Sequence, residues 1–127
     1  EQIASLDAIL AQMEQANATT DYAAYFNADC TFHKTIVGIC GNSILNNWVE
    51  KTSDHQQRIR YCTMGLSAEM GKSLSEHKNM VQYIRQKDPV MACEISKQHL
   101  ERALCELMKL KNGIYAGHLS MISGTHK

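Results

Sequence analysis

This chain of 127 residues has little proline and little glycine, and it has no excess of charge of either sign. One proline and seven glycines leave few points at which a helix must break. Thirteen basic residues balance thirteen acidic ones, so the chain lacks the positive surface with which a domain grips a nucleic-acid backbone. No apolar run approaches the roughly 18 residues of a membrane-spanning helix. What remains is a chain of 44% hydrophobic residues, enough for a helical domain with a real core.

The cysteines do not form a recognisable framework either. There are five, none lies in a CxxC pair, and their neighbours are helix-forming residues: Cys30, Cys40, Cys62, Cys93 and Cys105. An odd, scattered set of this kind indicates reduced thiols and a cytoplasmic protein rather than disulfides or a thiolate metal site.

Apolar residues recur every three to four positions through most of the chain, which predicts helices and no strands. We expect an all-α fold, an antiparallel bundle of five to six helices that forms one domain over residues 1–127. The predicted helices cover about residues 2–16, 21–40, 42–65, 73 onward to about 87, and 88–113. A loop is expected from Gly65 to Gly71, and a short helix or frayed tail after Gly113.

The ends of these helices carry recognisable signals. Asp21 is a good N-cap, and Gly41 ends the second helix. Ser73 and Glu76 have the spacing of a capping box, which predicts that the fourth helix begins there. Asp88 followed by proline is typical of a helix start.

Four ionisable side chains fall on the apolar stripes of these helices. Asp29 and His33 are four residues apart on the second helix, His77 lies on the fourth and His99 on the fifth. A buried carboxylate and buried imidazoles are costly unless they are paired, hydrogen-bonded or bound to a metal. We therefore predict a site for a divalent transition metal, with zinc favoured over nickel, manganese, iron or cobalt.

Two other interpretations stay open on the residues alone. A metal with an open coordination position is also the feature of a small metal-dependent hydrolase or oxygenase. The sequence places no clear general base beside the site, because Glu76 is explained as a capping residue. The second is a purely structural helical module, in which each histidine is a core residue hydrogen-bonded to a carbonyl group.

Several short motifs, taken in order, resemble one known family. They are Asp29-Cys-Thr-Phe-His33, Gly41-Asn42, Ser75-Glu76-His77, Lys87-Asp88-Pro89-Val90-Met91-Ala92 and Gln98-His99-Leu100. Their order and spacing are similar to those of the effector-binding (FCD) domain of FadR-type GntR regulators, from about residue 5 to about residue 108. Lys87 stands where that family usually has glycine.

The resemblance implies a bacterial transcriptional regulator that is not an enzyme. Such domains follow an N-terminal winged helix-turn-helix domain and bind small organic acids. In one subset, an aspartate and three histidines hold a divalent metal, and Asp29, His33, His77 and His99 match that set. Against the family pattern, the DNA-binding domain and the first bundle helix are expected to lie outside this chain.

The resemblance also directs attention to effector-binding residues and to a dimer. Arg58 is predicted to hold the effector's carboxylate in a two-point grip, although a surface ion pair is an equal alternative. Asn42 is a second candidate for contact with the effector, but an asparagine after glycine more often caps a helix. Ligand binding in the family acts through a homodimer, and Trp48 is expected in the core or on a dimer face.

Overall fold

The computed structural model describes the backbone of residues 1–63 and 67–123, and most side chains of residues 1–58 and 70–113. Within these ranges the chain forms five helices and no strand. They are α1 (Gln2–Ala18), α2 (Tyr22–Ile39), α3 (Ser43–Thr63), α4 (Ser67–Arg85) and α5 (Pro89–Ser123). The predicted all-α fold is therefore confirmed. None of the described helices is both long and apolar enough to cross a membrane.

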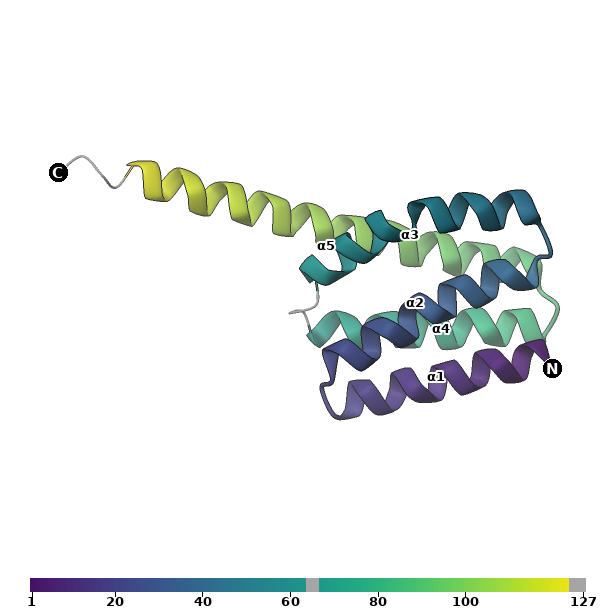
Figure 1. Ribbon diagram of the computed structural model, residues 1–127. Helices are drawn as coiled ribbons and strands as arrows, with labels where there is room; N and C mark the ends of the chain where they lie inside the picture. Colours follow the sequence, from purple (N-terminus) through teal and green to yellow (C-terminus); the bar gives the residue numbers. More distant parts are fainter. Residues whose placement is uncertain (64–66, 124–127) are drawn as a thin grey trace.

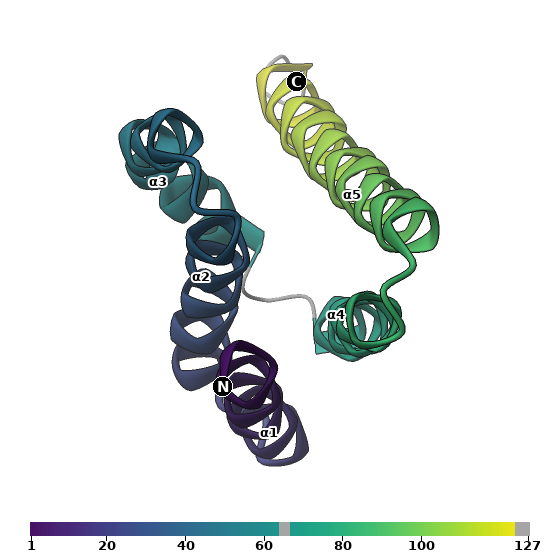
Figure 2. The same ribbon diagram turned by 90° about the vertical axis from the view of Figure 1, so that its right-hand side faces the viewer.

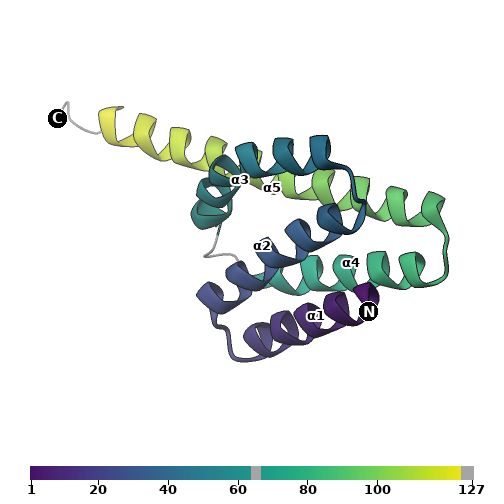
Figure 3. The same ribbon diagram turned by 45° about the vertical axis from the view of Figure 1, so that its right-hand side comes forward.

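Successive helices run in opposite directions, as in an antiparallel bundle (Figure 1). α1 packs against both α2 and α4, and α4 packs against α5. α3 lies along α2 and touches α5 only lightly. Seen end-on, the helices follow an arc in the order α3, α2, α1, α4 and α5 (Figure 2). The C-terminal part of α5 extends beyond the other helices (Figures 1 and 3).

The hydrophobic core is made by three of the five helices. Its buried apolar side chains come from α1, α2 and α4: Leu6, Ile9, Leu10, Met13, Ala16, Tyr25, Ala28, Phe32, Met70, Leu74, Met80 and Val81. Their spacing of three and four residues is the stripe expected of helices that face a common core. Among the described residues of α5, only His99 is fully buried. α5 therefore joins the bundle through this buried polar side chain and through Ile95, which is partly buried and packs against the core.

Three of the predicted helix boundaries are correct, because local chemistry fixes them. Asp21 accepts a hydrogen bond from the backbone N–H of Ala24 at 2.9 Å, and Asp88 accepts one from Met91 at 3.0 Å. Both bonds satisfy donors that the first turn of a helix leaves open. Gly41 adopts φ of +64°, the left-handed conformation that suits glycine after a helix.

The predicted loop from Gly65 to Gly71 is wrong where the structure describes it, because α4 already begins at Ser67. Residues 64–66 lie outside the described residues. Met70 is buried, and its carbonyl oxygen accepts a hydrogen bond from the Tyr25 hydroxyl at 2.8 Å. A glycine inside a helix costs about 1 kcal/mol. The burial of Met70 and its hydrogen bond to Tyr25 offset the cost of placing Gly71 inside the helix.

Two further boundary predictions are wrong. Ser73 and Glu76 lie inside α4 rather than at its start, so they are not a capping box. α5 does not end at Gly113 but continues to Ser123. Gly41 has a positive φ and Gly113 does not, and glycine ends a helix only when it adopts that conformation.

Two clusters of exposed apolar residues stand out among the side chains that the structure describes. One is the start of α3, where Ile44, Leu45 and Trp48 are 69%, 41% and 66% exposed. The other is on α5, where Leu100, Leu104 and Met108 face outward at helical spacing. Trp48, expected in the core or on a dimer face, is thus outside the core of this chain.

Candidate metal centre

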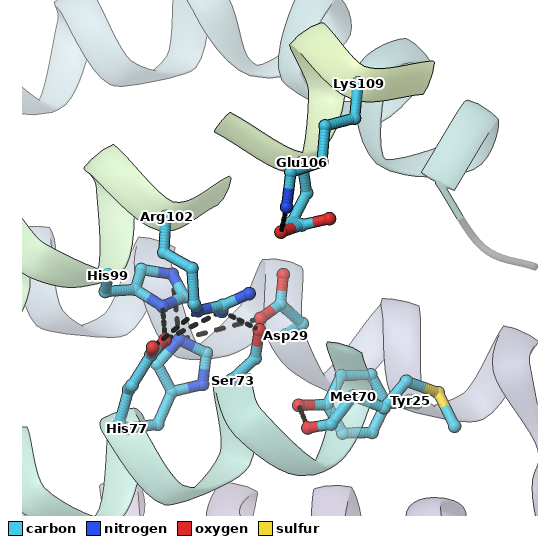
Figure 4. A network of polar contacts seen from close by, with 10 residues as sticks. Tyr25, Asp29, Met70, Ser73, His77, His99, Arg102, Glu106 and Lys109 are labelled. Atoms are coloured by element: carbon cyan, nitrogen blue, oxygen red, sulfur yellow. Dashed lines mark hydrogen bonds and ion pairs between the residues drawn. The ribbon is translucent and has the colours of Figure 1, made fainter. Parts of the chain in front are cut away.

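The four ionisable residues singled out in the sequence meet at one place between α2, α4 and α5. Asp29 and His33 come from α2, His77 from α4 and His99 from α5. Asp29, His77 and His99 are buried, whereas His33 is half-buried. Figure 4 shows Asp29, His77 and His99 side by side, with Arg102 and Ser73 next to them.

The distances between ligand atoms are short and similar. Asp29 Oδ1 lies 3.6 Å from His33 Nε2 and 3.7 Å from His77 Nε2. His77 Nε2 lies 3.4 Å from His99 Nε2. The ligand atoms offered by the three histidines all lie within 4.8 Å of one another. The three imidazoles thus converge on one point, and Asp29 Oδ1 lies close to two of them, those of His33 and His77.

These separations fit a bound transition metal. Ligand atoms about 2.0–2.1 Å from a tetrahedral zinc ion lie about 3.4 Å from one another. Three of the separations above are within a few tenths of an ångström of that value. Imidazole nitrogens and a carboxylate oxygen are also the donors that zinc, nickel, manganese, iron and cobalt accept.

Packing holds the imidazole rings in place. His77 has no exposed surface, and its ring stacks on Phe32 with centroids 4.3 Å apart and planes inclined by 27°. The His77 and His99 rings have centroids 4.6 Å apart, and the His33 ring lies 4.9 Å from that of His77. A ring fixed by the core cannot turn away, so the ligand set is largely preorganised.

A second layer of polar groups lies behind His99. His99 Nδ1 is 2.6 Å from Glu76 Oε2, and the guanidinium of Arg102 binds both carboxylate oxygens of Glu76. Arg102 Nη2 also donates to the hydroxyl of Ser73 at 2.8 Å. The two residues from α5 and the two from α4 therefore form one connected network (Figure 4).

The pKa shifts in this network follow from burial and from these contacts. Burial alone would raise the pKa of Glu76, but the hydrogen bonds from Arg102 and His99 outweigh it and hold that pKa below its ordinary value. Burial lowers the pKa of His99, against the opposing pull of Glu76. His99 is therefore neutral at pH 7, which is the form that binds metal.

Tyr25 lies on the side of α2 that faces α4. Burial first, and then the charge of Asp29, raise the pKa of the Tyr25 hydroxyl above its ordinary value. The hydroxyl stays protonated and donates to Met70. This bond joins α2 to α4 to one side of the cluster (Figure 4).

The two predicted effector residues lie on α3 and at its start, and both are exposed. The Asn42 side chain accepts hydrogen bonds from the backbone N–H groups of Ile44 and Leu45, each at 3.1 Å, so it caps α3. The structure records no contact between Arg58 or Asn42 and the cluster among the described residues.

Sequence reasoning missed the parts played by Glu76, Arg102 and Ser73. Glu76 was assigned to a helix cap, and Arg102 was not singled out. Arg102 is three residues after His99, and Glu76 is three after Ser73, so each pair lies on one helix face. This spacing of three residues was the signal in the sequence that could have identified the network.

One comparison with known proteins decides the family. The model of the FCD domain family matches residues 1–102, about four-fifths of the chain. The chain belongs to the FCD domain family. FCD domains are the effector-binding domains of GntR-family transcription regulators, which are not enzymes. No curated protein and no solved structure matches this FCD domain. The matched range contains all four residues of the cluster, and its last residue is Arg102.

Proposed function

We propose that this FCD domain binds a small organic acid at a divalent-metal centre and thereby alters the DNA affinity of an attached winged helix-turn-helix domain. The metal ligands in this proposal are Asp29, His33, His77 and His99. The observation that carries it is the convergence of three histidines from three helices, with Asp29 Oδ1 beside two of them, at separations that suit one metal ion.

The chemistry of the ligand set guides the choice of metal and effector. Zinc is favoured, and nickel, manganese, iron and cobalt have the same donor preferences. A divalent metal that expands to five- or six-coordination around these four ligands would have one or two positions for the oxygens of a small carboxylate. Asp29 and three neutral imidazoles contribute one negative charge, so an ion of charge +2 retains attraction for an anion.

Arg58 and Asn42 complete the proposal as effector contacts. Arg58 is exposed on α3, free of burial cost, and a guanidinium binds carboxylates through two parallel hydrogen bonds. The Asn42 carbonyl is committed to capping α3, which leaves its amide N–H₂ group for an effector oxygen.

The proposed mechanism is a shift between conformations, within a homodimer. An effector that binds one arrangement of the bundle more tightly favours that arrangement, and the spacing of the attached DNA-binding domains follows. The exposed apolar residues of α3, Ile44, Leu45 and Trp48, are the face proposed for the dimer. No chemical change of the effector is required.

A catalytic role is less well supported by the polar groups near the centre. The carboxylate nearest to the histidines, apart from Asp29, is that of Glu76. Both its oxygens accept hydrogen bonds from Arg102, and one also contacts His99. A carboxylate held in this way is a poor general base, because the hydrogen bonds from Arg102 and His99 stabilise its ionised form and lower its pKa.

Metal analysis of the purified chain tests the proposal. We expect about one metal ion per chain after dialysis against metal-free buffer, and restoration by added Zn²⁺ after chelation. Organic acids should then change the binding of the metal-loaded protein and remain chemically unaltered. Less than about half an equivalent of metal would contradict the proposal and favour a structural helical module.

The role of Arg58 is tested separately. We expect Arg58→Ala to weaken the binding of a dicarboxylate such as malonate by about 10-fold or more, because a two-point charged contact contributes about 1.5–3 kcal/mol. Isothermal titration of the metal-loaded variant measures this, with Lys51→Ala as the control on the same helix. Unaltered affinity with normal metal content would remove Arg58 from the site.

A further inference from the structure

The network behind His99 has a defined direction of hydrogen bonding. Arg102 is a donor only and keeps its charge at any physiological pH. Its Nε donates to Glu76 Oε1 at 2.5 Å and its Nη2 donates to Glu76 Oε2 at 2.7 Å. Both carboxylate oxygens therefore act as acceptors. The 2.6 Å contact between Glu76 Oε2 and His99 Nδ1 must then be a bond that His99 donates.

Because His99 donates this hydrogen bond, the ring nitrogen that carries the lone pair can be identified. A neutral imidazole carries its proton on one nitrogen and a lone pair on the other. With the proton on Nδ1, the lone pair is on Nε2. Nε2 is the atom that lies 3.4 Å from His77 Nε2, inside the four-residue cluster.

We propose that Glu76 and Arg102 are positioning residues that set the His99 tautomer and aim its Nε2 into the cluster. Glu76 does so through its bond to Nδ1, and Arg102 does so by fixing both oxygens of Glu76. The inference rests on the function proposed above, since it supposes that the cluster holds a metal. Carboxylates that orient a ligating histidine are a general feature of metal sites, and their loss costs about 10- to 100-fold in metal affinity.

The geometry explains why two residues are needed rather than one. His99 and Arg102 lie three apart on α5, and Ser73 and Glu76 lie three apart on α4. Arg102 therefore grips Glu76 and Ser73 from the same helix that carries the histidine. The Arg102 and Glu76 side chains are 21% and 23% exposed, so water competes only partly for these bonds. A lone glutamate on α4 could change rotamer, whereas this bidentate pair restricts it.

The alternative is that the pair only holds α4 and α5 together. A structural role of that kind would not affect the tautomer of His99. The decisive measurement is therefore the nitrogen chemical shifts of His99 in metal-free, ¹⁵N-labelled protein, because they separate Nδ1–H from Nε2–H. The second measurement is Zn²⁺ affinity by competition with a chromophoric chelator.

The variants are chosen to separate charge from packing. Glu76→Gln retains the shape and one acceptor, and Glu14→Gln is the matched control. Glu14 also forms an ion pair between two helices, with Lys78 at 2.7 Å, but it lies on the exposed α1–α4 surface. The double variant Glu76→Leu with Arg102→Met removes both charges together, so no unpaired charge remains if Glu76→Gln fails to fold.

The expected results follow directly. Wild-type protein should show Nδ1–H at His99, and both Glu76 variants should shift the ring toward Nε2–H. Their Zn²⁺ affinity should fall about 10- to 100-fold, and Glu14→Gln should match the wild type. A wild type that binds Zn²⁺, with variants that keep its affinity and tautomer, would overturn the positioning role alone. A wild type that binds no Zn²⁺ would overturn the proposed function as well.

Discussion

His77 has two roles, one in the packing of the core and one in the candidate metal centre. It has no exposed surface, stacks on Phe32, and still presents Nε2 to both Asp29 and His99. The same ring therefore belongs to the hydrophobic core and to the candidate metal centre. A substitution at this position should affect stability and metal content together.

We expect His77→Ala to lower the free energy of unfolding by about 2–4 kcal/mol, because it opens a cavity beside Phe32. It should also reduce bound metal to well below one ion per chain. Thermal melts in chelator isolate the packing loss, and elemental analysis measures the metal. The control is His55→Ala on the exposed surface of α3, expected to change stability by less than about 0.5 kcal/mol. Normal metal occupancy in His77→Ala would show that His77 is not a ligand.

Lys87 is a second residue whose position has a measurable consequence. It lies in the turn between α4 and α5 with φ of +57°, a region that L side chains other than asparagine and aspartate rarely adopt. The family to which the chain is similar usually has glycine here. The structure supplies the reason, which is that the turn needs a left-handed residue.

We expect Lys87→Gly to raise the free energy of unfolding by about 0.5–1 kcal/mol, because glycine adopts this φ without strain. The matched control is Lys97→Gly on an exposed turn of α5, which should lower it by about 1 kcal/mol. Urea denaturation measures both. The same sign for the two substitutions would contradict the argument.

At the scale of helices, the sequence predicts best where local chemistry decides the structure. The N-caps Asp21 and Asp88 and the terminating Gly41 form bonds or adopt angles within their own segments, so they could be found without the fold. The metal candidates could also be found, because a charged residue on an apolar stripe is visible in the sequence.

The errors lie where distant contacts outweigh local signals. Ser73 and Glu76 have capping-box spacing, but their partners are His99 and Arg102, more than 20 residues away. Gly71 suggested a loop, yet Met70 beside it is held by Tyr25 from α2. These contacts depend on how helices pack, which spacing within one helix does not specify.

The apolar residues at the start of α3, Ile44, Leu45 and Trp48, do not face the core. In the proposed homodimer these residues meet a partner. We expect Trp48→Ser to shift the purified protein from dimer to monomer, because a tryptophan at the centre of an interface typically contributes at least 2 kcal/mol. Light scattering coupled to size exclusion measures the mass, and Lys51→Ser is the control on the same helix. A dimer that persists in Trp48→Ser would exclude this face.

At the scale of the whole molecule, the core and the candidate metal centre are partly separate. The core joins α1, α2 and α4, whereas the centre joins α2, α4 and α5. Loss of metal should therefore weaken the attachment of α5 without unfolding the bundle. The two regions share α2 and α4, and α4 carries both Val81 of the core and His77 of the centre.

We expect chelation to lower the free energy of unfolding by about 2.7 kcal/mol when free metal had stood at 100 times its dissociation constant. The far-ultraviolet circular dichroism at 25 °C should change little, because the core is intact. Hydrogen exchange should rise in α5 more than in α1. Complete loss of helix on chelation would show that the core depends on the metal. An unchanged melting temperature would argue against metal binding.

Among the α5 residues whose side chains the structure describes, His99 is the one that is buried, and this gives the helix a mechanical property. α5 has 35 residues and reaches 24 residues beyond His99 to Ser123. At about 1.5 Å per residue, that arm is about 36 Å long, so a tilt of about 10° at His99 moves its end by about 6 Å. A small change in the orientation of α5 at His99 would then produce a much larger displacement of the C-terminal end of this helix.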